Sequence, residues 1–317
     1  MSAPGLYYSH PACLEHDPRV HSPAHPDTPE RLIVLERALA QRDWLGWERR
    51  LAPAAGEDEL ELVHSAAHVR SISDLCGIGG GAIDADTFVG EASFRAALHA
   101  AGAASAMTRA LLAGEAPVGF CAVRPSGHHA ESERAMGFCL FNNVAVAAAV
   151  AIAEMGLGRV LVLDWDVHHG NGTAEIFARR ADVLFASIHQ MPLYPGTGRP
   201  EERGAGPGEG FTINLPVAPG SREPEWLALL EEVVLPAAAA FAPELVLVSA
   251  GFDAHEADPL ADCLLSTRSF VRMASRVREL ARGAGVPLGV VLEGGYHPQV
   301  LAECVCATLP ALAGQDG

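Results

Sequence analysis

The sequence predicts a single-domain α/β fold with a mostly parallel sheet flanked by helices on both faces. Short apolar segments alternate along the chain with longer segments that have helical spacing or a high alanine content. Strands and helices that alternate in this way form parallel sheets with right-handed crossovers. Several of the short segments are followed directly by Asp, His, Gly or Tyr. Open α/β sheets place their sites at the carboxyl ends of the strands, so these residues are candidates for a site.

Five segments are predicted as buried strands because they are nearly continuous apolar runs rich in β-branched residues. They cover residues 118–123, 160–163, 183–188, 245–249 and 288–292. Helices are predicted over about 29–40, 93–113, 143–155, 223–240 and 266–282, from apolar spacing and alanine content. Residues 1–30 are rich in His and Pro, so extended loop is expected there.

The composition indicates one large domain. With 317 residues, 49% of them hydrophobic and 19% charged, the chain can bury one core, and a single domain over residues 1–317 is expected. The net charge is 22 − 39 = −17, which disfavours a nucleic-acid partner and mildly favours cationic ligands.

The cysteines and the hydropathy pattern predict the compartment. The seven cysteines lack the paired spacing of metal fingers, which indicates a reducing environment. The sequence shows neither a charged and then apolar leader nor an apolar run near the ~20 residues of a membrane span. We therefore expect a cytoplasmic protein without a membrane partner. Its oligomeric state stays open, and a homo-oligomer is not excluded.

Residues 159–172, RVLVLDWDVHHGNG, indicate a metal site. A buried strand runs directly into a cluster of aspartates and histidines. If the chain stays extended past Leu163, the side chains of Asp164, Asp166 and His168 project to one side, since residues two apart share a face. Carboxylate and imidazole groups on one side can hold a divalent metal.

Polar residues from separate strands should meet at one edge of the sheet, because parallel strands share a carboxyl edge. The expected set is His128, His129, Asp164, Asp166, His168, Ser187, Asp253 and Tyr296. The alternative is that each is an ordinary polar loop residue. That alternative does not explain why the strand ends carry mostly Asp and His beside glycines, so an enzyme is favoured.

Asp166, His168 and Asp253 fit a catalytic zinc ion, which keeps about three protein ligands and leaves one position open. The same ligand types also suit iron, cobalt or manganese. A bound metal lowers the pKa of water to ~7 and polarises a carbonyl oxygen, as hydrolysis of an unactivated amide requires.

His128 and His129 can serve the proton transfers of such a reaction. Adjacent residues of an extended loop point in different directions, so one histidine should face the reaction. The other should be oriented by an acid such as Asp164. Tyr296 follows two glycines and can donate a hydrogen bond to a developing oxyanion. Gly137 and Phe138 can form a wall of the pocket. For Phe138 considered without its neighbours, packing in the core is the favoured interpretation.

Six motifs together resemble the histone deacetylase family, specifically class II-like bacterial deacetylases and acetylpolyamine amidohydrolases. They are RPSGHHAE (124–131), MGFCLFNN (136–143), DWDVHHGNG (164–172), LYPGTG (193–198), SAGFDAH (249–255) and LEGGY (292–296). The resemblance implies the arginase-deacetylase fold, with an eight-stranded sheet and one zinc ion reached through a narrow tunnel.

The resemblance also implies roles for individual residues. Asp166, His168 and Asp253 are similar to the family's zinc ligands, and Tyr296 to its carbonyl-polarising tyrosine. His129 corresponds to the general base and acid, and His128 with Asp164 to its electrostatic partner. Asn171 stands behind His129, where a neutral amide should leave His129 less readily protonated than an aspartate would.

Further residues are implied for the tunnel, the inner cavity and two monovalent-cation sites. The tunnel set is Gly137, Phe138, Tyr194, Gly294 and, at the rim, Asp86. Tyr194 replaces a phenylalanine common in eukaryotic members. Arg31, an unfavourable cation in the first turn of its helix, matches an arginine near the inner cavity. The first K⁺ or Na⁺ site would be formed by Asp164, Asp166, His168, Ser187 and Ile188. The second would be formed by Phe177, Arg180, Val183 and Phe211.

The expected function is a zinc-dependent amidohydrolase that cleaves the acyl amide of an acylated amine, acetyl-lysine in proteins or a related acyl-lysine. An acetylpolyamine deacetylase is the main alternative. An arginase-type ureohydrolase, which needs two metals, and a non-catalytic acyl-amine binding protein are less favoured. The sequence leaves open the substrate, the acyl length and the choice between zinc, iron and cobalt.

Overall fold

An eight-stranded sheet forms the centre of the molecule, and all of its strand pairs are parallel. The computed structural model describes residues 4–315, so residues 1–3 and 316–317 of the expected domain lie outside the described residues. The strand order is β2-β1-β5-β10-β9-β6-β7-β8. The strands are β1 Leu6–Ser9, β2 Glu48–Leu51, β5 Val118–Cys121, β6 Val160–Asp164, β7 Val183–Gln190, β8 Thr212–Val217, β9 Leu245–Ala250 and β10 Leu288–Leu292.

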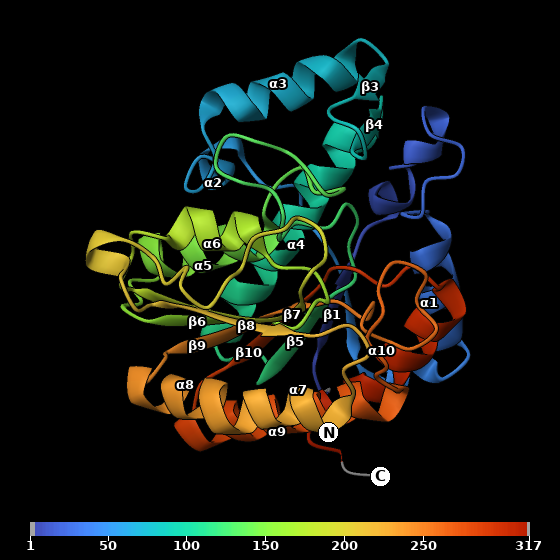
Figure 1. The fold of residues 1–317 in the computed structure, drawn as a ribbon. Helices are drawn as coiled ribbons and strands as arrows, with labels where there is room; N and C mark the ends of the chain where they lie inside the picture. Colours follow the sequence, from blue (N-terminus) through green and yellow to red (C-terminus); the bar gives the residue numbers. More distant parts are fainter. Residues whose placement is uncertain (1–3, 316–317) are drawn as a thin grey trace.

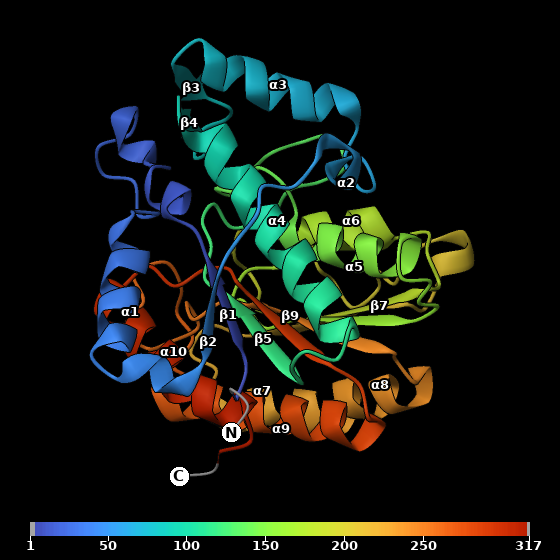
Figure 2. The same cartoon turned by 180° about the vertical axis from the view of Figure 1, so that it is seen from behind.

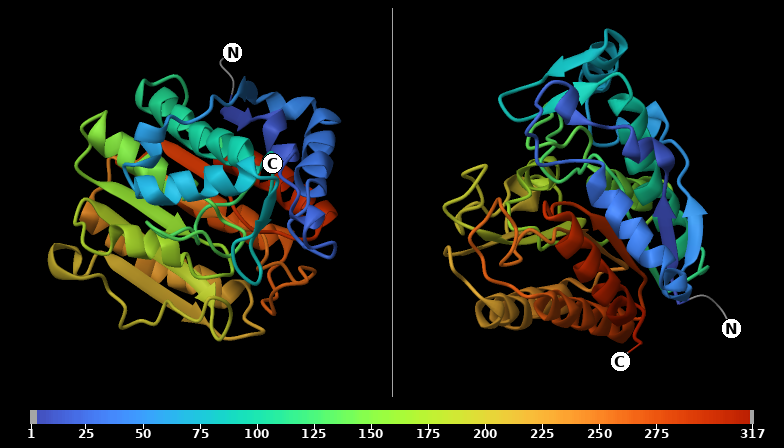
Figure 3. Two further views of the ribbon diagram at one scale, coloured as in Figure 1. Left: turned by 90° about the horizontal axis from the view of Figure 1, so that it is seen from above. Right: turned by 90° about the vertical axis from the view of Figure 1, so that its right-hand side faces the viewer.

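Helices cover both faces of this sheet (Figures 1 and 2). One face carries α4 Ser93–Leu112, α5 Asn143–Ala153 and α6 Asn171–Phe177. The other carries α7 Glu223–Leu229, α8 Leu235–Phe241, α9 Thr267–Ala284 and α10 Pro298–Leu312. Helix α1, Glu30–Ala40, packs along α10, so a segment from the first part of the chain lies beside one from its last part (Figure 3). The fold class predicted from the sequence is therefore confirmed.

A smaller unit lies near the amino-terminal end of α4. It consists of α2 Glu57–Leu60, α3 Ala66–Gly77 and the antiparallel strands β3 Gly80–Ala82 and β4 Phe88–Gly90. In Figures 1 and 2, α3 and the β3–β4 hairpin stand above α4, on the same side of the sheet as α5 and α6.

The five predicted strands are all present, with bounds shifted by at most a few residues. Strands β1, β2 and β8 were not predicted from the residues. β2 and β8 are the two edges of the sheet. β2 has the polar sequence ERRL and β8 contains Pro216, which an edge strand tolerates. The loop expected over residues 1–30 is wrong at β1, whose four residues pair with β2 and β5.

The predicted helices agree with the structure except over 223–240. There α7 and α8 are joined through a π-helical turn at Leu230–Val234. None of the helices within residues 4–315 is long and apolar enough to cross a membrane. All seven cysteines are buried and outside disulfides.

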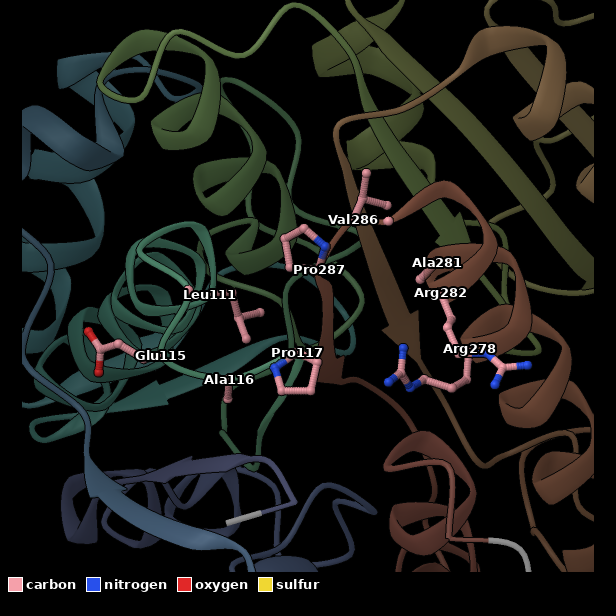
Figure 4. A pocket seen from close by; sticks show the side chains of 11 residues that line it. Leu111, Glu115, Ala116, Pro117, Arg278, Ala281, Arg282, Val286 and Pro287 are labelled. Atoms are coloured by element: carbon pink, nitrogen blue, oxygen red, sulfur yellow. The ribbon is translucent and has the colours of Figure 1, made fainter. Parts of the chain in front are cut away.

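A cavity of about 590 Å³ lies at the amino ends of β5 and β10, between α4 and α9 (Figure 4). Pro117 and Pro287, which precede the two strands, form part of its wall, with Arg278 and Arg282 from α9 opposite them. None of its lining residues is His, Asp or Cys. This cavity lies at the amino ends of the strands, whereas the candidate active-site residues follow their carboxyl ends. It is therefore not the candidate active site.

Candidate active site

The polar residues at the carboxyl edge of the sheet begin where β6 ends. Asp164 is the last residue of the strand, and its Oδ1 accepts a hydrogen bond from the amide of Asp166 at 3.0 Å. This bond turns the chain immediately, so the expectation that the segment stays extended to His168 is wrong. Asp164 therefore faces His128, whereas Asp166 and His168 face Asp253.

Asp166, His168 and Asp253 form a compact group of possible metal ligands. Their donor atoms lie within 4.8 Å of one another, and all three residues are buried. His168 Nδ1 is 3.0 Å from Asp166 Oδ1 and 3.3 Å from Asp253 Oδ2. Among the described residues, Asp253 Oδ2 has no hydrogen bond of acceptable geometry. A buried carboxylate oxygen without a partner is costly, and a bound cation would remove that cost.

The surroundings hold this group open for a cation. The amide of Gly294 donates to Asp166 Oδ2 at 2.8 Å, and the amide of Val167 donates to Asp253 Oδ1 at 3.0 Å. A Cβ at Gly294 or Gly251 would collide with the carboxylates of Asp253 and Asp166. Two carboxylates and one imidazole therefore fit a divalent metal such as zinc, although the donor types do not select it over iron or cobalt.

His128 and His129 lie in a turn instead of an extended loop, and their rings are 4.0 Å apart. Their rings therefore lie side by side, but the expectation that one of the two is oriented by Asp164 agrees with the structure. His128 Nδ1 is 3.0 Å from Asp164 Oδ2, and its Nε2 is 3.8 Å from Asp166 Oδ1. His129 Nδ1 is 2.8 Å from Asn171 Oδ1.

Glu131, which sequence reasoning missed, fixes the tautomer of His129 through Asn171. Asn171 Nδ2 donates to Glu131 Oε1 at 2.8 Å, so the oxygen of the Asn171 amide must face His129. The Nδ1 of His129 is then the protonated nitrogen, and its Nε2 keeps a free lone pair. The only sequence hint was the position of Glu131 two residues after the histidine pair.

The two histidines have opposite shifts in pKa. Burial alone lowers the pKa of His128, but the carboxylates of Asp166 and Asp164 outweigh it and raise the pKa to about 10. Burial lowers the pKa of His129 well below its usual range, and the charges of His128 and His168 lower it further. The neighbouring carboxylates therefore favour the charged form of His128, whereas burial favours the neutral form of His129.

A cavity of about 190 Å³ leads to this group. Its lining residues are Asp86, His129, Gly137, Phe138, His168, Leu193, Tyr194, Leu260 and Tyr296. The expected tunnel residues are thus brought together, apart from Gly294, which does not line the cavity and whose amide donates to Asp166. Leu193 and Leu260 were not expected: Leu193 begins the LYPGTG motif but had no role assigned to it, and nothing in the local sequence of Leu260 distinguishes it from a core leucine.

Aromatic rings form two sides of the cavity. Tyr194 meets His129 edge to face at a ring distance of 5.1 Å, and Phe138 meets Tyr296 at 5.7 Å. Gly137 and Phe138 have φ values of 56° and 66°. A Cβ at Gly137 would collide with the ring of His129, so glycine is required there.

Tyr296 is held from both sides by buried charged residues. Arg31 Nε donates to the carbonyl of Gly295 at 2.6 Å, and its guanidinium carbon lies 4.8 Å from the centre of the Tyr296 ring. Asp258 Oδ2 accepts from the amide of Tyr296 at 2.6 Å. Arg31 also pairs with Asp27 at 2.7 Å, which explains a buried arginine in the first turn of α1. Asp27 and Asp258 were not identified from the sequence.

The residues of the expected monovalent-cation sites lie around β6, α6 and β7. Ser187 is the register partner of Asp164 across β6 and β7. Near the second set, the carbonyl of Phe177 accepts from the amide of Arg180 at 2.9 Å, and the carbonyl of Phe211 accepts from Phe185 at 2.9 Å. Both ion sites stay predictions.

Known proteins resemble the chain over nearly its whole length. Residues 25–312 match the family described as "Histone deacetylase domain". The histone deacetylase-like amidohydrolase of Pseudomonas aeruginosa is 42% identical over 296 residues, which cover 92% of this chain and 77% of that protein. A probable deacetylase of Archaeoglobus fulgidus is 39% identical over 313 residues, covering 97% and 86%.

A solved structure agrees with the fold. The crystal structure of the HDA15 HD domain superposes with a TM-score of 0.94 at 37% sequence identity, covering 99% of this chain and 90% of that one. Family match, relatives and architecture point the same way, and the chain belongs to the histone deacetylase family of amidohydrolases.

Proposed function

We propose that this family member is a zinc-dependent deacylase that hydrolyses the acyl amide of acylated lysine side chains. The observation that supports it is the meeting of three possible metal ligands, a neutral imidazole and a tyrosine at one narrow cavity. Such a cavity suits a slender side chain with an amide at its tip. We also propose Asp166, His168 and Asp253 as the zinc ligands.

A zinc ion held by these residues would lower the pKa of water and polarise the acyl carbonyl. His129 then accepts the proton of the attacking water at Nε2, because Asn171 keeps the other nitrogen protonated. The same nitrogen gives a proton to the departing amine. His128 pairs with Asp164 and is proposed as the electrostatic partner of His129, without taking part in proton transfer.

Tyr296 would donate a hydrogen bond to the oxygen that gains charge in the transition state. Burial raises the pKa of its phenol well above the usual value, and Arg31 opposes this shift only in part. The hydroxyl therefore keeps its proton at neutral pH and remains a donor. Arg31 and Asp258 form hydrogen bonds with the backbone of Gly295 and Tyr296, and these bonds fix the position of the hydroxyl.

A chelation experiment tests the metal and the reaction. Turnover of an acetyl-lysine peptide should vanish after chelation and return with one equivalent of zinc per chain. Full activity in the chelated protein would contradict the proposal, and a requirement for two metals per chain would favour the ureohydrolase alternative.

Tyr296→Phe tests the donor. We expect kcat to fall by roughly 10²–10³-fold, with zinc binding unchanged. Tyr7→Phe is the control, since Tyr7 is a buried tyrosine on β1 that does not line the cavity, and its hydroxyl has no partner among the described residues. Similar losses in both variants would show that the effect is structural.

The substrate is resolved by a panel. Acetyl-lysine peptides, longer acyl-lysines, acetylputrescine and acetylspermidine would be compared by kcat/KM. The net charge of −17 suits a polyamine as well as a lysine-rich protein. A clear preference for the acetylpolyamines would replace acyl-lysine as the substrate and leave the chemistry unchanged.

Three further expectations belong to the proposal. They are structural K⁺ or Na⁺ ions at the two sets of residues around β7, a reducing cytoplasmic location and a single domain over the whole chain. The buried thiols outside disulfides support the location.

A further inference from the structure

Glu293 is a buried acid that the proposed reaction does not use. It follows β10 directly and is fully buried. Its Oε2 accepts hydrogen bonds from the amides of Gly127 at 2.7 Å and His128 at 3.2 Å. Its Oε1 accepts from the hydroxyl of Ser249, the register neighbour of Val291 on β9, at 3.1 Å. One carboxylate therefore joins the ends of β9 and β10 to the turn that carries the histidine pair.

Glu293 is itself fixed at both ends of its backbone. Its amide donates to the carbonyl of Ala250 at 3.0 Å, and its carbonyl accepts from the guanidinium of Arg31. The side chain therefore starts from a rigid base. Three donors occupy most of the positions that a carboxylate offers, which is the usual condition for burying one. Burial still raises the pKa of Glu293 to about 7, with His128 opposing.

The histidine turn depends on contacts of this kind. The carbonyl of His128 accepts from the amides of Gly172 at 3.0 Å and Thr173 at 3.2 Å. Its ring is fixed by Asp164, and only Glu293 holds its amide among the described residues. A Cβ at Gly127 would meet the amide of Asn143 at 2.5 Å, so the turn also lies tightly against the start of α5.

We propose that Glu293 is a positioning residue: its carboxylate, through the amides of Gly127 and His128, sets the place of both imidazoles over the metal-ligand group. The inference rests on the proposed function and deepens it. A displacement of about 1 Å in a catalytic group can cost 10²-fold in rate. Phe138 and Tyr194, which line the cavity, come from other segments, so substrate binding should be affected much less than turnover.

The test compares two substitutions in the zinc-loaded full chain. In Glu293→Gln the side-chain oxygen still accepts from both amides, and the NH₂ group can donate to Ser249. We expect kcat within about 3-fold of the parent protein. In Glu293→Ala the amides lose their acceptor, and we expect kcat to fall by about 10–100-fold, with KM changed less than about 3-fold and one zinc per chain retained.

Ser249→Ala is the matched control, because it removes the third hydrogen bond and leaves both amide contacts. We expect kcat within about 3-fold of the parent. The proposal is overturned if Glu293→Gln, folded and zinc-loaded, loses as much turnover as Glu293→Ala. It is also overturned if Glu293→Ala acts through KM or zinc loss. If Glu293→Ala does not fold, Glu293→Asp takes its place, since its shorter side chain cannot reach both amides.

Amide hydrogen exchange separates this inference from the proposed function. The amides of residues 127 and 128 should stay protected in Glu293→Gln and exchange faster in Glu293→Ala. This readout does not require turnover. If the parent protein does not deacylate any substrate, the proposed function fails while the exchange result still decides the role of Glu293. Unchanged protection in Glu293→Ala would overturn the inference even in an active enzyme.

Discussion

At the scale of single residues, the structure gives different partners to three neighbouring aspartates, Asp164, Asp166 and Asp253. Asp166 and Asp253 face the possible metal, whereas Asp164 faces His128. Each has its position fixed by a backbone amide, so exchanging a carboxylate for an amide at one position should leave the others in place. Their roles can therefore be tested one at a time.

Asp164→Asn should damage turnover far more than metal binding. The amide oxygen can still accept one hydrogen bond, but the negative charge that keeps His128 protonated is reduced. We expect kcat to fall by roughly 10–100-fold, with zinc still near one per chain. Asp166→Asn is the contrast, because it should lose zinc. Parallel loss of zinc and turnover in Asp164→Asn would show that Asp164 acts as a ligand.

At the scale of elements, close packing of α4 against residues 53–55 positions the smaller unit relative to the sheet. Gly102 lies in the middle of α4, fully buried. A Cβ there would collide with the carbonyl oxygen of Pro53 and would lie 2.6 Å from the amide of Ala55. Backbone atoms cannot rotate away as a flexible side chain can. The helix can approach this closely only with glycine at position 102.

Gly102→Ala should therefore destabilise the protein by about 1–3 kcal/mol, in spite of the better helix propensity of alanine. Gly283→Ala is the matched control in α9, where a Cβ would meet no atom within 4 Å. There we expect stabilisation of about 0.5–1 kcal/mol. Urea unfolding of both variants gives the comparison. Equal stability of Gly102→Ala and the parent protein would mean that α4 can move away without cost.

At the scale of the whole molecule, the sequence could predict what depends on local pattern and on parallel topology. The central strands are continuous apolar runs, and their shared carboxyl edge brings Asp166, His168 and Asp253 together. Contacts between distant segments leave no local pattern. Glu293 lies in the LEGGY motif, but neither Glu293 nor Asp258 has a local pattern that shows its partners, which are 166 and 38 residues away. The turn that aligns His128 and His129 depends on these contacts and was missed for the same reason.

Buried neutral histidines make the stability of the whole protein sensitive to acid. His64 is 4% exposed, and its Nε2 accepts from the amide of Asn142 at 2.8 Å while its Nδ1 faces the carbonyl of Glu131. Protonation of Nε2 would break the first of these bonds. Burial, aided by the charge of His68, lowers the pKa of His64 to about 3. The unfolded chain, in which the histidine has its ordinary pKa of ~6.5, therefore binds a proton first as the pH falls.

Because the unfolded state holds more protons between about pH 6.5 and pH 3, the free energy of unfolding must fall as the pH drops through this window. From pH 7 to pH 5 the contribution of His64 is on the order of 1–2 kcal/mol. Urea unfolding of the parent and of His64→Gln at both pH values measures it. Glutamine can accept the Asn142 hydrogen bond but does not titrate, so the loss between pH 7 and pH 5 should shrink by that amount.

His21→Gln, at an exposed position, is the matched control and should leave the loss unchanged. An identical pH dependence in the parent and in His64→Gln would show that His64 is not neutral and buried in the folded protein.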